Sequence, residues 1–471
     1  MKDISKRFDW GRFLKKVAVI AIPVALQNLM TSTGTMVDTM MIARVGETAV
    51  GAVGLCSQYS VLMLGCYWGF VGGGMLFISQ YWGAQDEEGI CRSYGLMLCC
   101  IMSVAVIFSS VALFAPQFVM RLYTDKVSIQ EIGIQYLKIA GFSYPLALFS
   151  ISASTLLRAT ERVRIPLYAA IGSVLSNIFL NWCLIYGNLG FPALGVRGAA
   201  IATVAAAGIN LSIIFICCAV TGYPFIFRFR AHFRWVGDKV REFFVKCFPI
   251  ILNEVFLGIG NMTVNAVLGR QSESAIAALA VFRTIEGFII SFFAGFSSSA
   301  SVLVGKSVGA GNLEDGYRKA KRIMPLCVIT VALVGLLANI LKPQILQAMS
   351  LTGPSFEIAS YIITVFMFVA MIRMGNWCMN DTFRSAGDSV TGTTLELVFM
   401  YVMVIPVVCI TGLKLKVSIY LLFPLVYCDE IIRFVIMTIH LFSGRFIRPV
   451  TPQGKAALAE FRGTLRRKKM R

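Results

Sequence analysis

The chain has 471 residues, of which 57% are hydrophobic and 14% charged, whereas soluble globular proteins carry about 25% charged residues. This composition excludes an ordinary soluble enzyme, a disordered protein and a fibrous protein, and it indicates that most of the chain lies in lipid. The formal net charge of +19 would suit a nucleic-acid-binding protein until the placement of the charges is considered.

Twelve apolar stretches follow one another along the chain, each close to the length of about 20 residues that crosses a bilayer as a helix. They cover residues 17–41, 50–78, 91–114, 131–157, 165–187, 194–219, 243–268, 275–305, 322–346, 357–383, 392–413 and 418–443. The first stretch contains Gln27 and Asp38 and has no cleavage site, so we do not expect a cleaved signal peptide. The sequence therefore predicts an all-α membrane protein with twelve transmembrane helices.

The basic residues are distributed unevenly between the two sides of the predicted spans. Most of the 43 Lys and Arg residues lie in alternate loops that include both termini, and such loops mark the cytoplasmic side. We therefore predict a multi-pass protein with both termini in the cytoplasm and no nucleic-acid partner. The basic tail, residues 444–471, is expected to meet anionic lipid headgroups. The thirteen cysteines lie mostly in apolar runs, where thiols behave as small hydrophobic groups, so no metal cluster is expected.

The two halves of the chain repeat each other. A shift of 226 positions superimposes Pro23 on Pro249, Glu47 on Glu273, Gly69 on Gly295, Gly83 on Gly309 and Arg158 on Arg384. Because each half holds six spans, the halves are parallel repeats, and such repeats enclose the substrate path of many transporters. We predict a first lobe of residues 1–219, a cytoplasmic linker of residues 220–242 that forms an interfacial segment or short surface helix, and a second lobe of residues 243–443. Arg158, Arg384 and the two glycine turns are expected to serve topology and hinges.

Polar side chains recur on one face of the first span. Gln27, Thr31, Thr35 and Asp38 follow at steps of four, four and three, which places them along one side of a helix. In the fifth span Asn177 and Asn181 are one turn apart, and the sixth contains Thr203. Because a carboxylate in lipid is costly unless it serves a partner or an ion, we predict a coupling-ion site for Na⁺ or H⁺ at Asp38, Asn177, Asn181 and Thr203. A Na⁺ ion would bind Asp38, Asn177 and Asn181.

The second half contains more charged residues. Arg283 with Glu286, and Glu430 with Arg433, are spaced for ion pairs on one helix, whereas Glu254 has no basic neighbour on its own helix and is predicted to attract a cationic substrate. Arg373 and Asp381 pair either with each other or with the eighth span. We expect the substrate cavity to be lined by Gln27, Thr31, Glu254, Asn261, Arg283, Glu286, Arg373 and Asp381.

Several of these segments resemble the multidrug and toxic compound extrusion (MATE) family. The similarity lies in IPVALQNLMTSTGTMVDTMMIARVG (residues 22–46), in SNIFLNWCLIYGNLGFPALGVRGAAIAT (residues 176–203), and in the matched turns GAQDEEG and GAGNLEDG. It covers about residues 10–445. The resemblance implies a V-shaped fold with two lobes, in a bacterial plasma membrane, and a secondary-active exporter of organic cations or other amphipathic compounds in exchange for Na⁺ or H⁺.

The family's site residues can be placed on this sequence one by one. The acid of its first span falls on Asp38, its asparagine pair on Asn177 and Asn181, and its threonine on Thr203. The NorM-like branch also has a tenth-span acid, whose position is occupied here by Arg373, so we favour Asp38 alone as the coupling acid. Sodium and proton coupling both remain open.

Other functions fit the sequence less well. A lipid-linked oligosaccharide flippase of the same superfamily is the alternative, but such proteins have more spans and a more basic cavity. The triplet Gly305-Lys306-Ser307 resembles the end of a nucleotide-binding loop, yet the required first glycine is Ala300. We therefore expect no enzyme activity, no cofactor, no nucleotide, a small amphipathic substrate, membrane lipid as surroundings, and a monomer.

Overall fold

The computed structural model describes residues 9–349 and 352–469, and every regular element in these ranges is helical. The start of the basic N-terminal stretch and the last two residues of the predicted tail lie outside them. The first half contains α1 (Trp10–Ala43), α2 (Glu47–Ala84), α3 (Glu87–Phe114), α4 (Pro116–Tyr123), α5 (Val127–Ala140), α6 (Ser143–Ala159), α7 (Arg164–Tyr186), η1 (Asn188–Gly190) and α8 (Val196–Val220). The remainder contains α9 (Phe229–His232), α10 (Gly237–Leu268), α11 (Glu273–Gly309), α12 (Leu313–Ala348), α13 (Gly353–Ser385), α14 (Thr391–Phe399), η2 (Met400–Val404), α15 (Ile405–Cys409), η3 (Ile410–Lys414), α16 (Ile419–Leu425), α17 (Glu430–Ser443) and α18 (Pro452–Lys469).

Most of the predicted spans are continuous helices. Nine of the described helices, and the continuous run from α14 to η3 (Thr391–Lys414), are long and apolar enough to cross a bilayer. Helices α5 and α6, bent by 51° at their junction, make an eleventh if the pair is counted as one span. The twelfth predicted span is broken into α16 and α17, which have 7 and 14 residues. Pro424 lies near the end of α16, and Asp429 precedes α17. A proline weakens a helix by removing a backbone hydrogen bond, which explains why the span is interrupted near Pro424.

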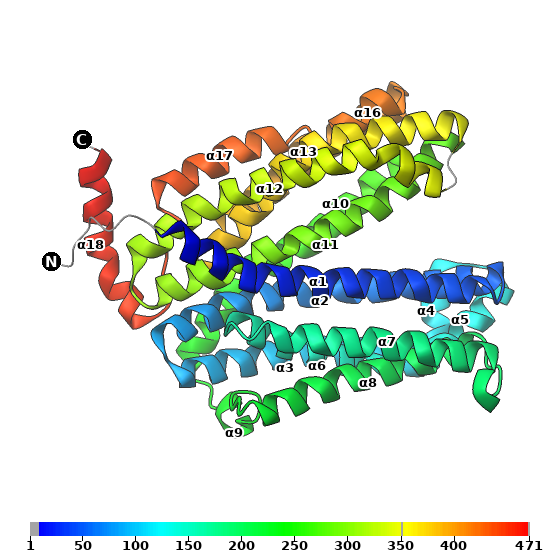
Figure 1. Ribbon diagram of the computed structural model, residues 1–471, viewed down its shortest axis with the longest axis horizontal. Coiled ribbons are helices and arrows are strands. Elements are labelled where there is room, and N and C mark those ends of the chain that lie inside the picture. The colour runs from blue at the N-terminus through cyan, green and yellow to red at the C-terminus, as the bar shows by residue number, and fades with distance from the viewer. Residues whose placement is uncertain (1–8, 350–351, 470–471) are drawn as a thin grey trace.

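The helices form two groups, as Figure 1 shows. Helices α1 to α8 make one lobe and α10 to α17 the other. The lobes lie close together at the end where α18 crosses the bundle, which we call the α18 end, and they diverge toward the end that carries α4 and α5 (Figure 1). The chain is a multi-pass membrane protein with the expected two-lobe architecture.

The first helix of each lobe begins in the apolar core of the other lobe. Phe13 and Val17 of α1 belong to the apolar core that α11, α12 and α13 build in the second lobe. In return, Phe243 and Cys247 of α10 belong to the core of the first lobe. The exchange follows the internal repeat, because α1 and α10 are the first helices of the two halves.

Small residues allow these exchanged helices to approach. A Cβ added to Gly69 of α2 would lie 2.6 Å from the Cα of Ile251 in α10, and one added to Gly295 of α11 would lie 2.3 Å from the carbonyl oxygen of Ala21 in α1. Gly69 and Gly295 are repeat-related. Close backbone approach at small residues is the usual mode of helix packing in membranes, so the repeated glycines mark the two symmetric crossings.

The linker between the lobes is exposed along most of its length, but a few of its side chains are buried. It contains the short helix α9, and α10 begins at Gly237, inside the range predicted for the linker. Tyr223, Phe225 and His232 are buried, and α9 packs on α3. Phe229 and Trp235 of the same segment are exposed.

Candidate functional site

The predicted coupling site lies between α1 and α7. Asn181 donates a hydrogen bond of 2.6 Å from Nδ2 to Oδ1 of Asp38, and the same nitrogen lies 3.2 Å from Oδ1 of Asn177. Gly34 brings the helices together here, since a Cβ at this position would lie 3.1 Å from Val174 of α7. The helical spacing seen in the sequence therefore does place the carboxylate and both amides in one cluster.

One oxygen of this cluster lacks a partner. Asn181 is 0% exposed, and because its nitrogen faces the two acceptors, its Oδ1 is buried without a hydrogen bond among the described residues. Carboxylate and carbonyl oxygens are ligands that hard cations prefer. The donor set of Asp38, Asn177 and Asn181 thus fits a hard cation, and Asp38 alone offers a place for a proton.

Two further side chains border the cluster. Thr203 of α8 donates its hydroxyl hydrogen to the carbonyl oxygen of Ala199, at 2.9 Å, so its oxygen can still accept. Tyr136 of α5 lies near both Thr203 and Asp38. Tyr136 was not among the predicted site residues, because a tyrosine in an apolar helix is usually part of the core.

The polar stripe on α1 continues from Asp38 toward the α18 end. Thr31 and Thr35 are exposed, and their hydroxyls donate to the carbonyl oxygens one turn earlier, at 3.0 and 3.1 Å. Gln27 accepts a hydrogen bond of 2.8 Å from the guanidinium group of Arg158. The stripe therefore connects the cluster around Asp38 with a charged residue of α6.

A cavity of about 100 Å³ lies between the lobes. Its walls come from α2, α6, α11 and α13, and its polar lining residues are Thr155, Arg158, Ser298, Ser301, Asp381, Arg384 and Ser385. Arg158 and Arg384, which were expected to serve topology and hinges rather than to contact substrate, both have side chains that line this space. Their repeated occurrence in the two halves was the signal that could have identified them.

Two acids of the expected substrate cavity, Glu254 and Asp381, are paired with the same arginine. Glu254 of α10 lies 3.3 Å from Arg384 of α13, and Asp381 lies 3.7 Å from the same guanidinium group. Asp381 also accepts a hydrogen bond from Ser297. Glu254 has no basic neighbour on its own helix, as the sequence indicates, but its partner comes from another helix.

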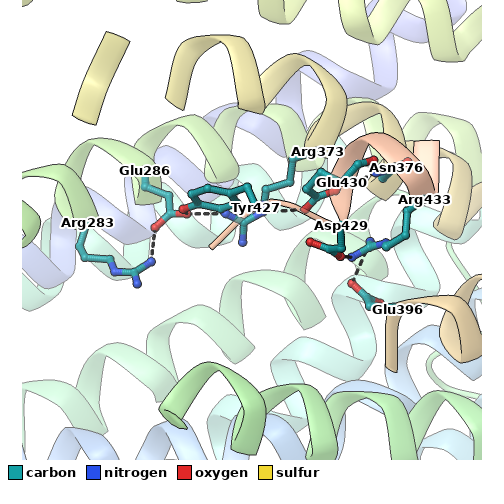
Figure 2. A network of polar contacts seen from close by, with 9 residues as sticks. All are labelled: Arg283, Glu286, Arg373, Asn376, Glu396, Tyr427, Asp429, Glu430 and Arg433. Atoms are coloured by element: carbon teal, nitrogen blue, oxygen red, sulfur yellow. Dashed lines mark hydrogen bonds and ion pairs between the residues drawn. The ribbon is translucent and has the colours of Figure 1, made fainter. Parts of the chain in front are cut away.

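A network of buried charges crosses the second lobe (Figure 2). Glu286 of α11, which is 4% exposed, lies between Arg283 and Arg373, each at 2.6 Å. Arg373 also lies 3.8 Å from Glu430 of α17, which accepts a hydrogen bond of 2.7 Å from Asn376. Of the partners considered for Arg373, the structure selects the eighth span and not Asp381.

The break before α17 supplies the other end of this network. Arg433 lies 3.0 Å from Asp429 and 3.5 Å from Glu396, and the buried Asn253 and Asn380 both donate to Glu396. The expected ion pair between Glu430 and Arg433 is replaced by these contacts. Asp429 is the N-cap of α17 and has helical backbone angles, so its side chain lies one helical turn from Arg433.

The predicted residues therefore fall into three clusters. Asp38, Asn177 and Asn181 form the first, with Thr203 at its border. Gln27, Glu254 and Asp381 surround the two cavity arginines, and Arg283, Glu286 and Arg373 belong to the buried network. The remaining two, Thr31 on α1 and Asn261 on α10, are exposed. Among the described residues, no group of three His, Cys, Asp or Glu side chains is arranged to hold a metal ion.

Comparison with known proteins identifies a family. The MatE family model matches residues 23–183 and 249–410. The two matched segments begin at the repeat-related prolines Pro23 and Pro249, so the family pattern itself occurs twice in the chain.

Curated relatives cover most of the chain at low identity. The probable multidrug resistance protein YoeA of Bacillus subtilis is 20% identical over 412 residues, which are 86% of this chain and 88% of the relative. The probable multidrug resistance protein NorM of Rhizobium meliloti is 24% identical over 373 residues, 74% of this chain and 78% of the relative.

Solved structures of transporters share the fold. The Vibrio cholerae MATE transporter VcmN in its bent form superimposes with a TM-score of 0.81 at 16% identity, covering 92% of this chain and 97% of that one. A multidrug resistance MATE family transporter in an outward-facing conformation gives a TM-score of 0.79 at 17% identity, covering 96% and 99%.

Proposed function

Since the chain belongs to the MATE family of transporters, we propose that it is a secondary-active antiporter that exports organic cations or other amphipathic compounds. Na⁺ or H⁺ entering the cell would drive export by alternating access. The observation that carries this proposal is the hydrogen-bonded cluster of Asp38, Asn181 and Asn177 inside the first lobe. The names of the relatives support the substrate class.

Binding of the coupling ion would change the contacts of Asp38. A proton on the carboxylate would weaken its role as an acceptor for Asn181, and Na⁺ would replace the amide hydrogen with a metal contact. Either event removes the charged hydrogen bond that now joins α1 to α7. A ligand shifts a conformational equilibrium when it binds one state better than the other, so ion binding can favour one orientation of the lobes.

The substrate would bind between the lobes, where the cavity lies. The ion pairs around the cavity and in the network of the lobe formed by α10 to α17 contain six acids, Glu254, Glu286, Asp381, Glu396, Asp429 and Glu430, and four arginines, Arg283, Arg373, Arg384 and Arg433. The difference is two negative charges. The lining of the cavity itself carries Asp381 with Arg158 and Arg384, so attraction of a cationic substrate would come from the surplus of acids around the cavity and not from its own walls.

The proposed location follows the charge distribution. We place the protein in a bacterial plasma membrane as a monomer, with both termini and the α18 end on the cytoplasmic side, where most Lys and Arg residues lie. The lobes diverge toward the opposite side (Figure 1). No nucleotide or cofactor takes part in the proposed cycle.

Transport by the purified protein in liposomes tests the function. A fluorescent organic cation is followed while a sodium gradient and a pH gradient are imposed separately. We expect gradient-driven movement of the cation with at least one of the two ions. Movement of labelled lipid-linked oligosaccharide without movement of any cation would instead support a flippase.

A further inference from the structure

The chain segment after α17 crosses from one lobe to the other at the α18 end. This segment, residues 444–455, leads from the C-terminus of α17 into α18. Phe446 and Ile447 are buried in the core of the second lobe together with Tyr317 and Phe461. Val450, which is 1% exposed, belongs instead to the core of the first lobe. Only two residues, Arg448 and Pro449, thus separate Ile447 in one apolar core from Val450 in the other.

Hydrogen bonds fasten the crossing point. The side chain of Gln80 in α2 donates from Nε2 to the carbonyl oxygen of Ser385 in α13, at 2.8 Å, and its Oε1 accepts from the amide of Val450, at 2.9 Å. Thr451 donates its hydroxyl hydrogen to the carbonyl oxygen of Gly309 in α11, at 2.7 Å. Gln80 therefore joins one lobe, the other lobe and the crossing segment in a single buried contact.

Charged groups hold the segment on either side of this point. Arg448 lies 3.2 Å from the buried Asp388, which also accepts a hydrogen bond of 2.9 Å from His440. Burial raises the pKa of Asp388, but the hydrogen bonds from His440 and Thr391 and the charge of Arg448 outweigh it, so that the pKa is lowered and the carboxylate stays charged. On the far side, Lys455 lies 3.1 Å from Glu242 of α10.

Helix α18 anchors the end of the segment. It lies across the bundle at the α18 end, roughly perpendicular to the long helices (Figure 1). Phe461 packs edge to face on Tyr317 of α12, with ring centroids 5.9 Å apart, and Leu465 lies against Gly444. The helix therefore stays with the second lobe while Val450 reaches into the first.

We propose that residues 444–455 form a latch that holds the two lobes together at the α18 end and must release before the lobes separate there. Separation moves α2 away from α11 and α13, and Gln80 cannot then keep both Ser385 and Val450. Either Val450 leaves the apolar core of the first lobe, or Phe446 and Ile447 leave the core of the second. The latch therefore favours the arrangement that is closed at this end.

A native cysteine reports on this closure. Cys247 of α10 is 0% exposed and belongs to the core of the first lobe. A Cβ added to Gly73 of α2 would lie 2.0 Å from its sulfur, so Cys247 seals the contact between α2 and α10. Cys218 and Cys327 are equally buried, at 0% and 1% exposure, but each lies within one lobe.

The test is maleimide labelling of the full-length protein in liposomes, quantified for each cysteine by peptide mass spectrometry. Val450→Asp places a charge in the first lobe, Thr451→Val removes only one hydroxyl, and Ala459→Asp adds a charge on the exposed side of α18 as the matched control. We expect Cys247 to label about fivefold faster or more in Val450→Asp, and to a smaller extent in Thr451→Val, while Cys218 and Cys327 keep their wild-type rates.

The three cysteines together distinguish release from unfolding. Three results would overturn the proposal. The labelling rate of Cys247 could stay at the wild-type value in both Val450→Asp and Thr451→Val, or it could rise equally at all three cysteines. It could also rise as much in Ala459→Asp as in Val450→Asp. The inference rests on the alternating opening proposed above, but the labelling needs neither substrate nor coupling ion. A failure of the transport experiment would therefore leave this result interpretable.

Discussion

Gly83 and Gly309 make the same contact from opposite halves of the molecule. A Cβ added to Gly83 of α2 would lie 2.0 Å from the carbonyl oxygen of Lys306, and one added to Gly309 of α11 would lie 1.9 Å from the carbonyl oxygen of Gln80. Lys306 and Gln80 are themselves repeat-related. Helices α2 and α11 thus cross symmetrically at the α18 end, and their backbones are in direct contact there.

Gly83→Ala is therefore expected to force the lobes apart at this crossing. The added methyl group meets a carbonyl oxygen that belongs to a helix and cannot move aside, so the closed arrangement should lose about 2 kcal/mol. Thermal unfolding in detergent measures the loss. Gly65→Ala on the same helix is the control, because nothing lies within 4 Å of that position and alanine favours the helix. Equal stability of the two variants would contradict the crossing.

Asn181→Ala should show whether Na⁺ or H⁺ is the coupling ion. If the ion is Na⁺, loss of the amide oxygen removes a ligand, and the sodium concentration for half-maximal transport should rise about tenfold. If the ion is H⁺, the carboxylate of Asp38 loses a hydrogen bond that favours its charged form, and half-maximal transport should move to lower proton concentration. Unchanged dependence on both ions would exclude Asn181 from the site.

Glu286→Gln should destabilise the second lobe strongly. Glu286 is the shared partner of Arg283 and Arg373, and removing one member of a buried ion pair costs about 3 to 5 kcal/mol, because the other charge is left without compensation. The matched control is Glu273→Gln, an exposed position in the first turn of the same helix. Similar unfolding temperatures for both variants would show that the network contributes little.

The buried linker histidine predicts a sensitivity to acid. His232 is 0% exposed, its Nε2 lies 2.7 Å from the carbonyl oxygen of Phe225, and its Nδ1 has no partner among the described residues. Burial lowers the pKa of His232 below the ordinary value of 6.5. The stabilising contribution of the neutral ring is therefore complete above that ordinary value and is lost as the pH falls through the folded-state pKa.

Thermal unfolding at several pH values between neutral and mildly acidic conditions tests this sensitivity. The wild type should lose stability as the pH falls, and His232→Gln, which can still donate to Phe225, should lose less over the same interval. Parallel pH curves for the two proteins would show that another group is responsible.

Much of the architecture could be predicted from the sequence, because spans, repeats and helix faces depend on patterns along the chain. The spacing of Asn177 and Asn181 and the lone acid Asp38 were enough to predict their cluster, since the face of each helix that carries polar groups must avoid lipid. The repeat likewise predicted two six-span lobes.

The partners between helices were less predictable. Both Asp429 and Glu430 lie within one helical turn of Arg433, and Glu430 instead contacts Arg373 and Asn376 of α13. The partner of Glu254 likewise depends on how α13 is rotated against α10. The docking of Val450 in the opposite lobe had no signal in the sequence, since a single valine in a basic tail shows no periodicity. Contacts of this kind are determined by tertiary packing, which local patterns do not encode.

The central claim is that Asp38 couples the ion gradient to export, and Asp38→Asn in liposomes tests it most directly. The variant keeps the size of the side chain, and substrate binding to the detergent-solubilised protein verifies that it is folded. We predict that substrate movement driven by the sodium gradient or the pH gradient falls at least about tenfold, as expected for the loss of a charge-dependent contact. Substrate movement that remains at the wild-type rate under both gradients would contradict the account.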